Sequence, residues 1–213
     1  MAITIKQILV FIIILSPGFA NAHFKIKLLD RERNPVSQAV ISIATKLPSG
    51  SVESIAIMDQ IDKQFMPYVL IIHKDQLVSF PNSDNIRHHV YSFSEPKTFE
   101  IKLYRGTPGS PDLFDKPGIV ILGCNIHDHM VGYIYVAENE ITAITDENGI
   151  AILESKVPEA VKIWHAQLSD SSDKSISVPL VDRNDEDIWQ VIVDLHPPVV
   201  KEPRKFKARF KQN

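Results

Sequence analysis

Short apolar stretches separated by prolines and glycines make up most of this 213-residue chain. In many of them apolar and polar residues alternate, as at Phe24, Ile26 and Leu28, and this period is typical of strands with one buried face. No stretch has the pattern of a long amphipathic helix. Strands are expected at 52–58, 68–73, 76–80, 89–93, 98–104, 119–123 and 131–136, with two more between Phe24 and Thr45. Many short strands punctuated in this way predict an all-β chain built of β-sandwiches.

The first 22 residues have the pattern of a secretory signal peptide. Lys6 precedes an apolar stretch at 8–15, which is followed by Pro17 and by Ala20-Asn21-Ala22. The apolar stretch is too short for a permanent transmembrane helix, and Ala-x-Ala suits signal peptidase. We therefore expect cleavage after Ala22 and a mature chain that begins at His23 and has no integral membrane segment. The expected compartment is the periplasm of a Gram-negative bacterium.

Charge is distributed unevenly along the chain. The formal net charge is -3, of which Lys6 contributes one positive charge and residues 201–213 contribute a net five, which leaves about -9 on residues 23–200. Residues 199–213 are expected to be a basic, disordered tail, and a docking arm for an acidic partner or a membrane surface is the alternative. The acidic body and the expected export argue against nucleic-acid binding.

Cys124 is the only cysteine, and it begins a segment rich in metal-binding side chains. An exported protein normally pairs its cysteines, so a lone thiol is safe from misoxidation only when it is buried or occupied. Two residues separate Cys124 from His127, and two more separate His127 from Met130, so one tight loop can direct all three side chains to one point. Two imidazoles, a thiolate and a weak axial thioether suit a copper ion that shuttles one electron. The spacing therefore predicts a mononuclear copper site.

The second imidazole must come from elsewhere in the chain, and the pair His88-His89 is the candidate. Strand alternation sends these two side chains to opposite faces, so a shift of one residue in register would exchange them. From the residues alone, either histidine can be the ligand. Other metals fit less well, because structural zinc gains little from a thioether and an iron–sulfur cluster needs more cysteines.

The order of these landmarks resembles that of the cupredoxin family. The matching segments, within residues 51–138, are Phe80-x-Asn82-x-Asp84, His88-x-Val90, Phe114-Asp115-Lys116-Pro117-Gly118 and Cys124-x-x-His127-x-x-Met130. The two-residue gaps on both sides of the loop histidine are similar to those of amicyanin, a cupredoxin of methylamine utilisation. The resemblance implies a Greek-key β-sandwich that binds one type 1 copper. The ligands it implies are His88, Cys124, His127 and Met130.

The resemblance also bears on three neighbouring residues. His89 takes the place of an asparagine that links the ligand loops by a hydrogen bond in several family members. Gly123 and His129 depart from the family, which commonly has aromatic residues before the cysteine and before the methionine. His129 is therefore expected to be a surface group or a group that supports the ligands, and the alternative is a competing ligand.

The flanking segments resemble a second kind of sandwich, the carboxypeptidase-regulatory-like or transthyretin-like domains. The residues that carry this resemblance are Asp30-x-x-x-Asn34-Pro35-Val36, Thr145-Asp146-x-Asn148-Gly149 and Val161-x-Ile163-Trp164-His165. We therefore expect a cupredoxin domain at 51–138 and a small accessory β-sandwich made of 23–50 and 139–198. One elongated cupredoxin with extra strands is the alternative.

The resemblance implies a periplasmic type 1 copper protein that carries single electrons between redox partners, such as a dehydrogenase and a c-type cytochrome. Because the protein fills the favoured coordination positions, no position is left for a substrate, which argues against an enzyme. Copper storage or delivery is the alternative function, and a copper brace at the mature His23 has no other support. In the cupredoxin pattern the electron leaves through His127, for which the expected apolar rim is Met66, Pro67 and Val131.

Overall fold

The computed structural model describes residues 23–45, 54–127, 129–184 and 186–196. Every regular element in these ranges is a β-strand and none is a helix, which confirms the all-β prediction. Accordingly, the described residues offer no helix that could cross a membrane. The expected signal peptide at 1–22 and the expected tail at 199–213 lie outside the described residues.

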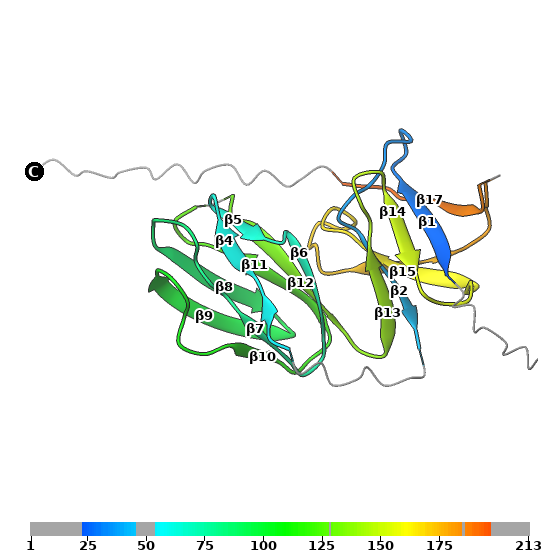
Figure 1. Cartoon of the computed structure of the whole chain (residues 1–213). Coiled ribbons are helices and arrows are strands. Elements are labelled where there is room, and N and C mark those ends of the chain that lie inside the picture. The colour runs from blue at the N-terminus through cyan, green and yellow to red at the C-terminus, as the bar shows by residue number, and fades with distance from the viewer. Residues whose placement is uncertain (1–22, 46–53, 128, 185, 197–213) are drawn as a thin grey trace, which may run out of the picture.

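The middle of the chain forms a sandwich of two main sheets, which we call the central sandwich (Figure 1). Its larger sheet has the order β6-β12-β11-β8-β9, in which only β6 and β12 are parallel. These strands are β6 (Val69–His73), β8 (His88–Ser94), β9 (Lys97–Tyr104), β11 (Gly118–Gly123) and β12 (Val131–Ala137). The smaller sheet has the order β10-β7-β3, and a hairpin of β4 and β5 lies beside it. These strands are β3 (Ala56–Ile57), β4 (Asp59–Ile61), β5 (Gln64–Met66), β7 (Gln76–Ser79) and β10 (Asp112–Phe114).

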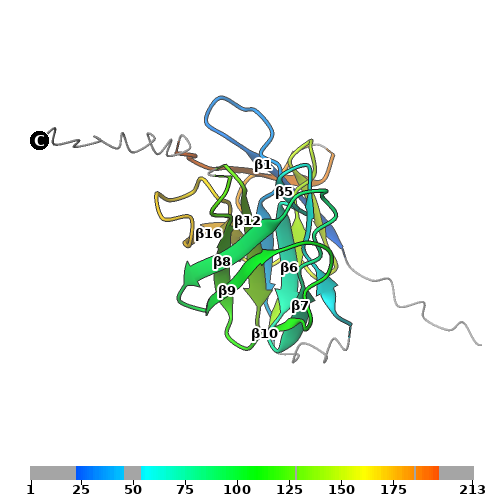
Figure 2. The same cartoon turned by 90° about the vertical axis from the view of Figure 1, so that its left-hand side faces the viewer.

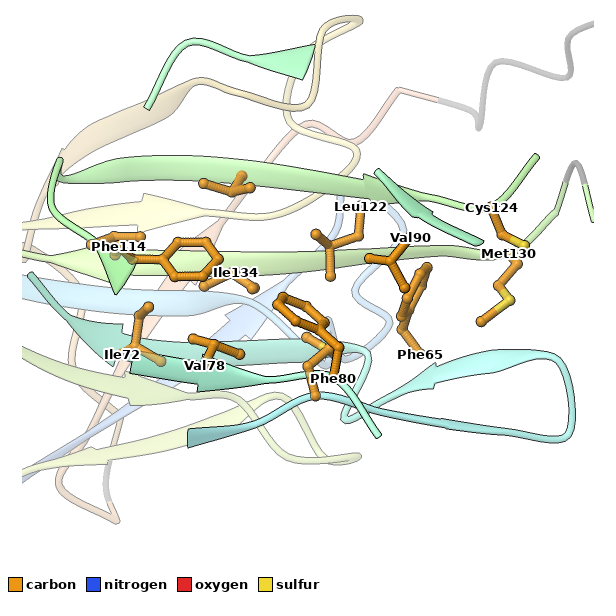
Figure 3. Close-up of a cluster of buried hydrophobic side chains, with 13 residues drawn as sticks. Phe65, Ile72, Val78, Phe80, Val90, Phe114, Leu122, Cys124, Met130 and Ile134 are labelled. Atoms are coloured by element: carbon orange, nitrogen blue, oxygen red, sulfur yellow. The ribbon is translucent and has the colours of Figure 1, made fainter. Parts of the chain in front are cut away.

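An apolar core fills the central sandwich because each strand turns alternate side chains inward. Along β8, for example, Val90 and Ser92 are buried whereas Phe93 is exposed. The core contains Met58, Phe65, Ile72, Val78, Phe80, Val90, Phe114, Val120, Leu122, Cys124, Met130, Ile134 and Val136. At one end of it lie the sulfur-containing side chains of Cys124 and Met130, close to each other (Figure 3).

Both ends of the described chain together form a second sandwich, which we call the flanking sandwich (Figure 1). One sheet has the order β14-β1-β17, in which β1 pairs antiparallel with β14 and parallel with β17. The other has the order β13-β2-β15-β16. The strands are β1 (Phe24–Leu29), β2 (Val40–Ala44), β13 (Glu140–Ile144), β14 (Ile150–Leu153), β15 (Ala160–Trp164), β16 (Ser175–Pro179) and β17 (Ile188–Ile192). This sandwich has an apolar core of its own, with residues from Phe24 to Ile41 and from Ala151 to Val193.

A third apolar cluster joins the two sandwiches, and Figure 2 shows the central sandwich in front of the flanking one. Trp164 of β15 packs against Tyr133 of β12, with ring centroids 5.2 Å apart. Lys162, two residues earlier on β15, lies over the ring of Tyr135, two residues later on β12. The two strands therefore run in opposite directions where they face each other. The larger central sheet is therefore covered on one face by its own core and on part of the other by the flanking sandwich.

Most strands of the central sandwich lie within one residue of their predicted bounds, but three were missed and one is shorter than expected. The expected strand at 52–58 is reduced to β3, and its first two residues are outside the described ranges. Strands β4, β5 and β10 were not predicted. The β4–β5 hairpin turns at Asp62 and Lys63, which both have positive φ, and this pair lacks the usual glycine or asparagine signal of such a turn. The domain boundaries remain a prediction.

Candidate metal centre

The predicted metal ligands come from two adjacent strands of the larger central sheet. Cys124 directly follows β11 and His88 begins β8, and the two strands pair through Gly123 and Tyr91. The loop after β11 turns back at His127, whose carbonyl accepts a hydrogen bond from the amide of Met130 at 2.9 Å. Antiparallel pairing therefore brings the start of β8 and the loop after β11 to the same end of the sandwich.

Three potential ligand atoms converge there. Sγ of Cys124 and one ring nitrogen from each of His88 and His127 lie within 4.8 Å of one another. His88 Nδ1 is 3.9 Å from Cys124 Sγ, and the rings of His88 and His127 have centroids 5.1 Å apart. Met130 belongs to the same buried cluster as Cys124 and lies at the same end of it (Figure 3). The structure thus brings together three of the four predicted ligands and places the fourth in the adjoining core.

A carboxylate fixes the orientation of the buried His88. Asp84 Oδ2 is 2.6 Å from His88 Nε2, while the same carboxylate accepts hydrogen bonds from the amides of Asp62 at 2.7 Å and Lys63 at 3.0 Å. Burial acts to raise the pKa of Asp84, but these hydrogen bonds outweigh it and hold the pKa below its usual value. An ionised Asp84 favours a proton on Nε2, which leaves the lone pair of Nδ1 facing Cys124.

His127 also presents a nitrogen suited to metal binding. Its Nδ1 is buried and has no hydrogen-bond partner among the residues that the structure describes. Loss of hydration, together with His88, Lys63 and His129, lowers the pKa of His127, which favours the neutral imidazole that metals require. A buried ring nitrogen without a partner is uncommon in a folded protein, and a metal bound beside Cys124 would satisfy this one.

The donor set fits copper. A thiolate, two imidazoles and a thioether suit a soft ion that alternates between Cu(I) and Cu(II), whereas magnesium and calcium prefer oxygen donors. His88, Cys124 and Met130 are at most 4% exposed, and only His127 is partly exposed. Such a set is shielded from water on all sides but one.

His89 does not take part in this cluster. Its Nε2 is 2.9 Å from Glu100 Oε1 on β9, and its Nδ1 is buried without a partner in the described part of the chain. Within the described residues, His89 therefore bonds to β9 and not to the ligand loop. The reason is the alternation of β8, which turns His88 into the central core and His89 to the other face.

The contact between Asp84 and His88 is a feature of the site that the sequence analysis did not predict. Asp84 was noted only as a landmark, although its position four residues before His88 is a usable signal. Ile126 is 47% exposed beside His127, while Met66 is 45% exposed and Val131 half-buried. His129 is exposed, with its ring centroid 6.1 Å from that of His127.

Comparison with known proteins gives structural similarity only. No protein-family model and no curated protein sequence matches the chain. Its structural neighbours are cupredoxins. A purple cupredoxin from Nitrosopumilus maritimus is 19% identical, with a TM-score of 0.35, over 38% of this chain and 99% of its own. An amicyanin variant is 16% identical, with a TM-score of 0.36, over 47% of this chain and 99% of its own.

Part of a larger protein also matches. A copper-containing nitrite reductase from Thermus scotoductus SA-01 is 26% identical, with a TM-score of 0.38. The match covers 40% of this chain and only 23% of the reductase, so the chain corresponds to less than a quarter of that protein's length. The predicted likeness of the flanking segments to carboxypeptidase-regulatory-like domains stays a prediction.

Proposed function

We propose that this protein is an exported carrier of single electrons that binds one type 1 copper through His88, Cys124, His127 and Met130. The observation that carries the proposal is the convergence of a His88 nitrogen, Cys124 Sγ and a His127 nitrogen within 4.8 Å, with Met130 buried in the same core cluster as Cys124. The copper-binding part is residues 51–138, and the flanking segments form an accessory domain. Bound copper would supply a one-electron couple.

The residues around the centre suit electron transfer better than catalysis. Four protein side chains fill the coordination positions that such a site favours, so a substrate has no place to bind. Asp84 and the sheet hold His88 in one orientation, and rigid ligands limit rearrangement when the charge of the centre changes. Burial of Cys124 favours the state of lower net charge, which is the reduced one.

The electron exit that fits this arrangement is His127. It is the most exposed of the four proposed ligands, and the exposed Ile126 precedes it in the loop. An apolar surface around a partly exposed ligand allows a partner to approach closely without desolvating charges. We propose periplasmic redox proteins as partners, with a dehydrogenase on one side and a c-type cytochrome on the other.

Spectroscopy of residues 23–213 loaded with Cu(II) tests this proposal. The parent is expected to show an intense thiolate-to-copper charge-transfer band in the visible region, with the EPR signal of a type 1 centre. Cys124→Ser should abolish the band, and His88→Ala should abolish or strongly alter it. His89→Ala is the matched control, because that residue is adjacent in the chain but pairs with Glu100 instead.

Three outcomes would overturn parts of the proposal. A parent without the charge-transfer band would exclude a type 1 site. Loss of the band in His89→Ala but not in His88→Ala would exchange the two histidines. A parent that shows the band but passes its copper readily to an acceptor protein, without a reversible one-electron couple, would point to copper storage or delivery.

A further inference from the structure

The outer face of β8 carries a stripe of three aromatic rings that the metal centre does not use. His89, Tyr91 and Phe93 share this face because alternate residues of a strand point the same way. The ring centroids of His89 and Tyr91 are 5.5 Å apart, and those of Tyr91 and Phe93 are 5.2 Å apart. These distances correspond to direct contact between neighbouring rings. The stripe is therefore continuous along β8, from His89 near the metal centre to Phe93 near the other end of the strand.

The stripe touches the chain beside the thiolate. A Cβ atom at Gly123 would lie 2.7 Å from Cζ and 2.8 Å from Oη of Tyr91, which is closer than Cβ atoms approach other side chains in real proteins. The ring of Tyr91 thus occupies the space that a side chain at position 123 would need. Gly123 is bonded directly to Cys124, so one peptide unit and one van der Waals contact connect the thiolate residue to the stripe.

The far end of the stripe is open to solvent. Phe93 is 82% exposed, which makes it the most exposed large apolar side chain among the described residues. Burial of a phenyl ring away from water is favourable, and the exposed ring of Phe93 does not gain this free energy within the chain. A partner that covers the ring on binding would gain it. Exposed aromatic side chains of this kind are typical anchors of protein interfaces.

We propose that Tyr91 and Phe93 form a second electron port, distinct from the exit at His127, where a basic redox protein docks. This inference rests on the proposed function. One electron passes from the reduced centre to the oxidised partner, or in reverse, while no bond is made or broken and no proton moves. The rings serve as a contact path for tunnelling and are not themselves oxidised.

Charge favours a partner with an apolar docking patch and a basic rim. Residues 23–200 carry a net charge of about -9. Glu100 lies opposite Tyr91 in the β8–β9 register with a side chain that is 55% exposed, and Glu95 follows β8 with one that is 86% exposed. Lys116 offsets Glu95 only in part, at 3.8 Å. Acidic groups beside an apolar anchor attract a basic partner and orient its approach.

Two oxidants distinguish the port from the copper centre. The copper-loaded chain is reduced and then mixed with oxidised cytochrome c, a basic haem protein, or with ferricyanide, a small oxidant that needs no docking surface. Phe93→Ser is expected to slow oxidation by cytochrome c about tenfold, the scale of an interface anchor, and to leave the ferricyanide rate and the reduction potential unchanged. Val181→Ser is the matched control, because Val181 is 74% exposed on the flanking sandwich.

Binding is measured separately from electron transfer. When both proteins are reduced, cytochrome c should shift the NMR amide signals of residues 91–100 in the parent and not in Phe93→Ser. Tyr91→Leu tests the path, because it should retain these shifts but slow the reaction, whereas Tyr91→Phe retains the ring and should keep the parental rate.

The proposed port is excluded if cytochrome c oxidises Phe93→Ser at a rate within twofold of the parental rate, or if it oxidises Val181→Ser as slowly as Phe93→Ser. An equal loss with ferricyanide would place the effect at the copper centre and also overturn the port. Amide shifts confined to residues near His127 would assign all docking to the loop. Failure of the proposed function is a different result, since the parent would then lack the charge-transfer band and the one-electron couple.

Discussion

The two sandwiches have similar cores but very different ends. The core of the central sandwich finishes in Cys124 and Met130, with His88 buried beside them. The core of the flanking sandwich is apolar throughout, and the buried polar groups around it make hydrogen bonds within the protein. Thr145 Oγ1, for instance, accepts a hydrogen bond from the amide of Ala39 at 2.9 Å. The difference shows that the proposed chemistry depends on the loops at one end of a sandwich and not on the fold alone.

The junction determines whether the two sandwiches behave as separate bodies. Trp164 is 1% exposed and contacts both Tyr133 and Tyr135 across the junction. Ser42 Oγ lies 3.1 Å from Tyr135 Oη, which in turn donates to Glu140 at 2.8 Å. Apolar burial and a satisfied polar network therefore connect the two cores, and we expect the chain to unfold in one cooperative transition.

The largest effect is expected from Trp164→Ala. Removing a fully buried indole costs the burial of its surface and leaves a cavity, so the free energy of unfolding should fall by about 3–5 kcal/mol. The single transition should also separate into two, one for each sandwich. Urea denaturation followed by far-ultraviolet circular dichroism and by the copper absorption band measures both effects.

Trp189 provides the control for this variant. It is partly buried on β17, away from the junction, and its ring lies 5.7 Å from the guanidinium of Arg183. Trp189→Ala should lower stability by less and keep one transition. Two transitions in the parent would contradict this coupling, because they would show that the two sandwiches unfold independently.

An effect restricted to the central sandwich is expected from Asp84→Asn. The variant loses the charge that holds the proton on His88 Nε2. Loss of such a supporting group typically weakens metal binding 10- to 100-fold, so the affinity for copper should fall by about this factor while Cys124 still gives a charge-transfer band. Competition with a chelator of known affinity measures the change.

Asp146→Asn is a closely matched control from the flanking sandwich. Its carboxylate accepts hydrogen bonds from the amides of Asn148 at 2.9 Å and Ile150 at 2.8 Å, much as Asp84 accepts two backbone amides, but it contacts no histidine. Asp146→Asn should leave the affinity for copper unchanged. Equal losses in the two variants would mean that Asp84 acts only by closing its turn.

The sequence predicted what depends on local spacing. The gaps between Cys124, His127 and Met130 placed three residues in one loop, and alternation predicted most of the strands around them. The resemblance to cupredoxins selected His88 over His89, and His88 is the one that lies beside Cys124.

Contacts between distant segments could not be predicted in this way. The ring of Tyr91 on Gly123 depends on the pairing of β8 with β11, and the amides that Asp84 accepts come from the β4–β5 hairpin. The packing of Trp164 on Tyr133 depends on how two sandwiches meet. Such contacts follow from strand pairing and sheet packing, for which a single sequence contains no periodic signal.

The smallest effect is expected from a buried histidine of the flanking sandwich, His165, which has no carboxylate partner comparable to Asp84 among the described residues. It is 9% exposed, and its Nδ1 accepts only the amide of Gln167, at 3.2 Å. Burial lowers the pKa of His165 below its ordinary value of 6.5. Below that value the unfolded chain takes up a proton that the folded chain resists, so the stability that neutral His165 contributes is present above about pH 6.5 and is lost as the pH falls.

In the parent, the free energy of unfolding should therefore fall when the pH is lowered from above to below about 6.5, and in His165→Gln this fall should be smaller. Urea denaturation of the metal-free protein at the two pH values measures this slope, and groups other than His165 cancel in the comparison with the parent. An unchanged slope in His165→Gln would show that protonation of this residue is accommodated in the folded chain. A buried histidine of the flanking sandwich would then tolerate charge without a partner, whereas His88 has Asp84 beside it.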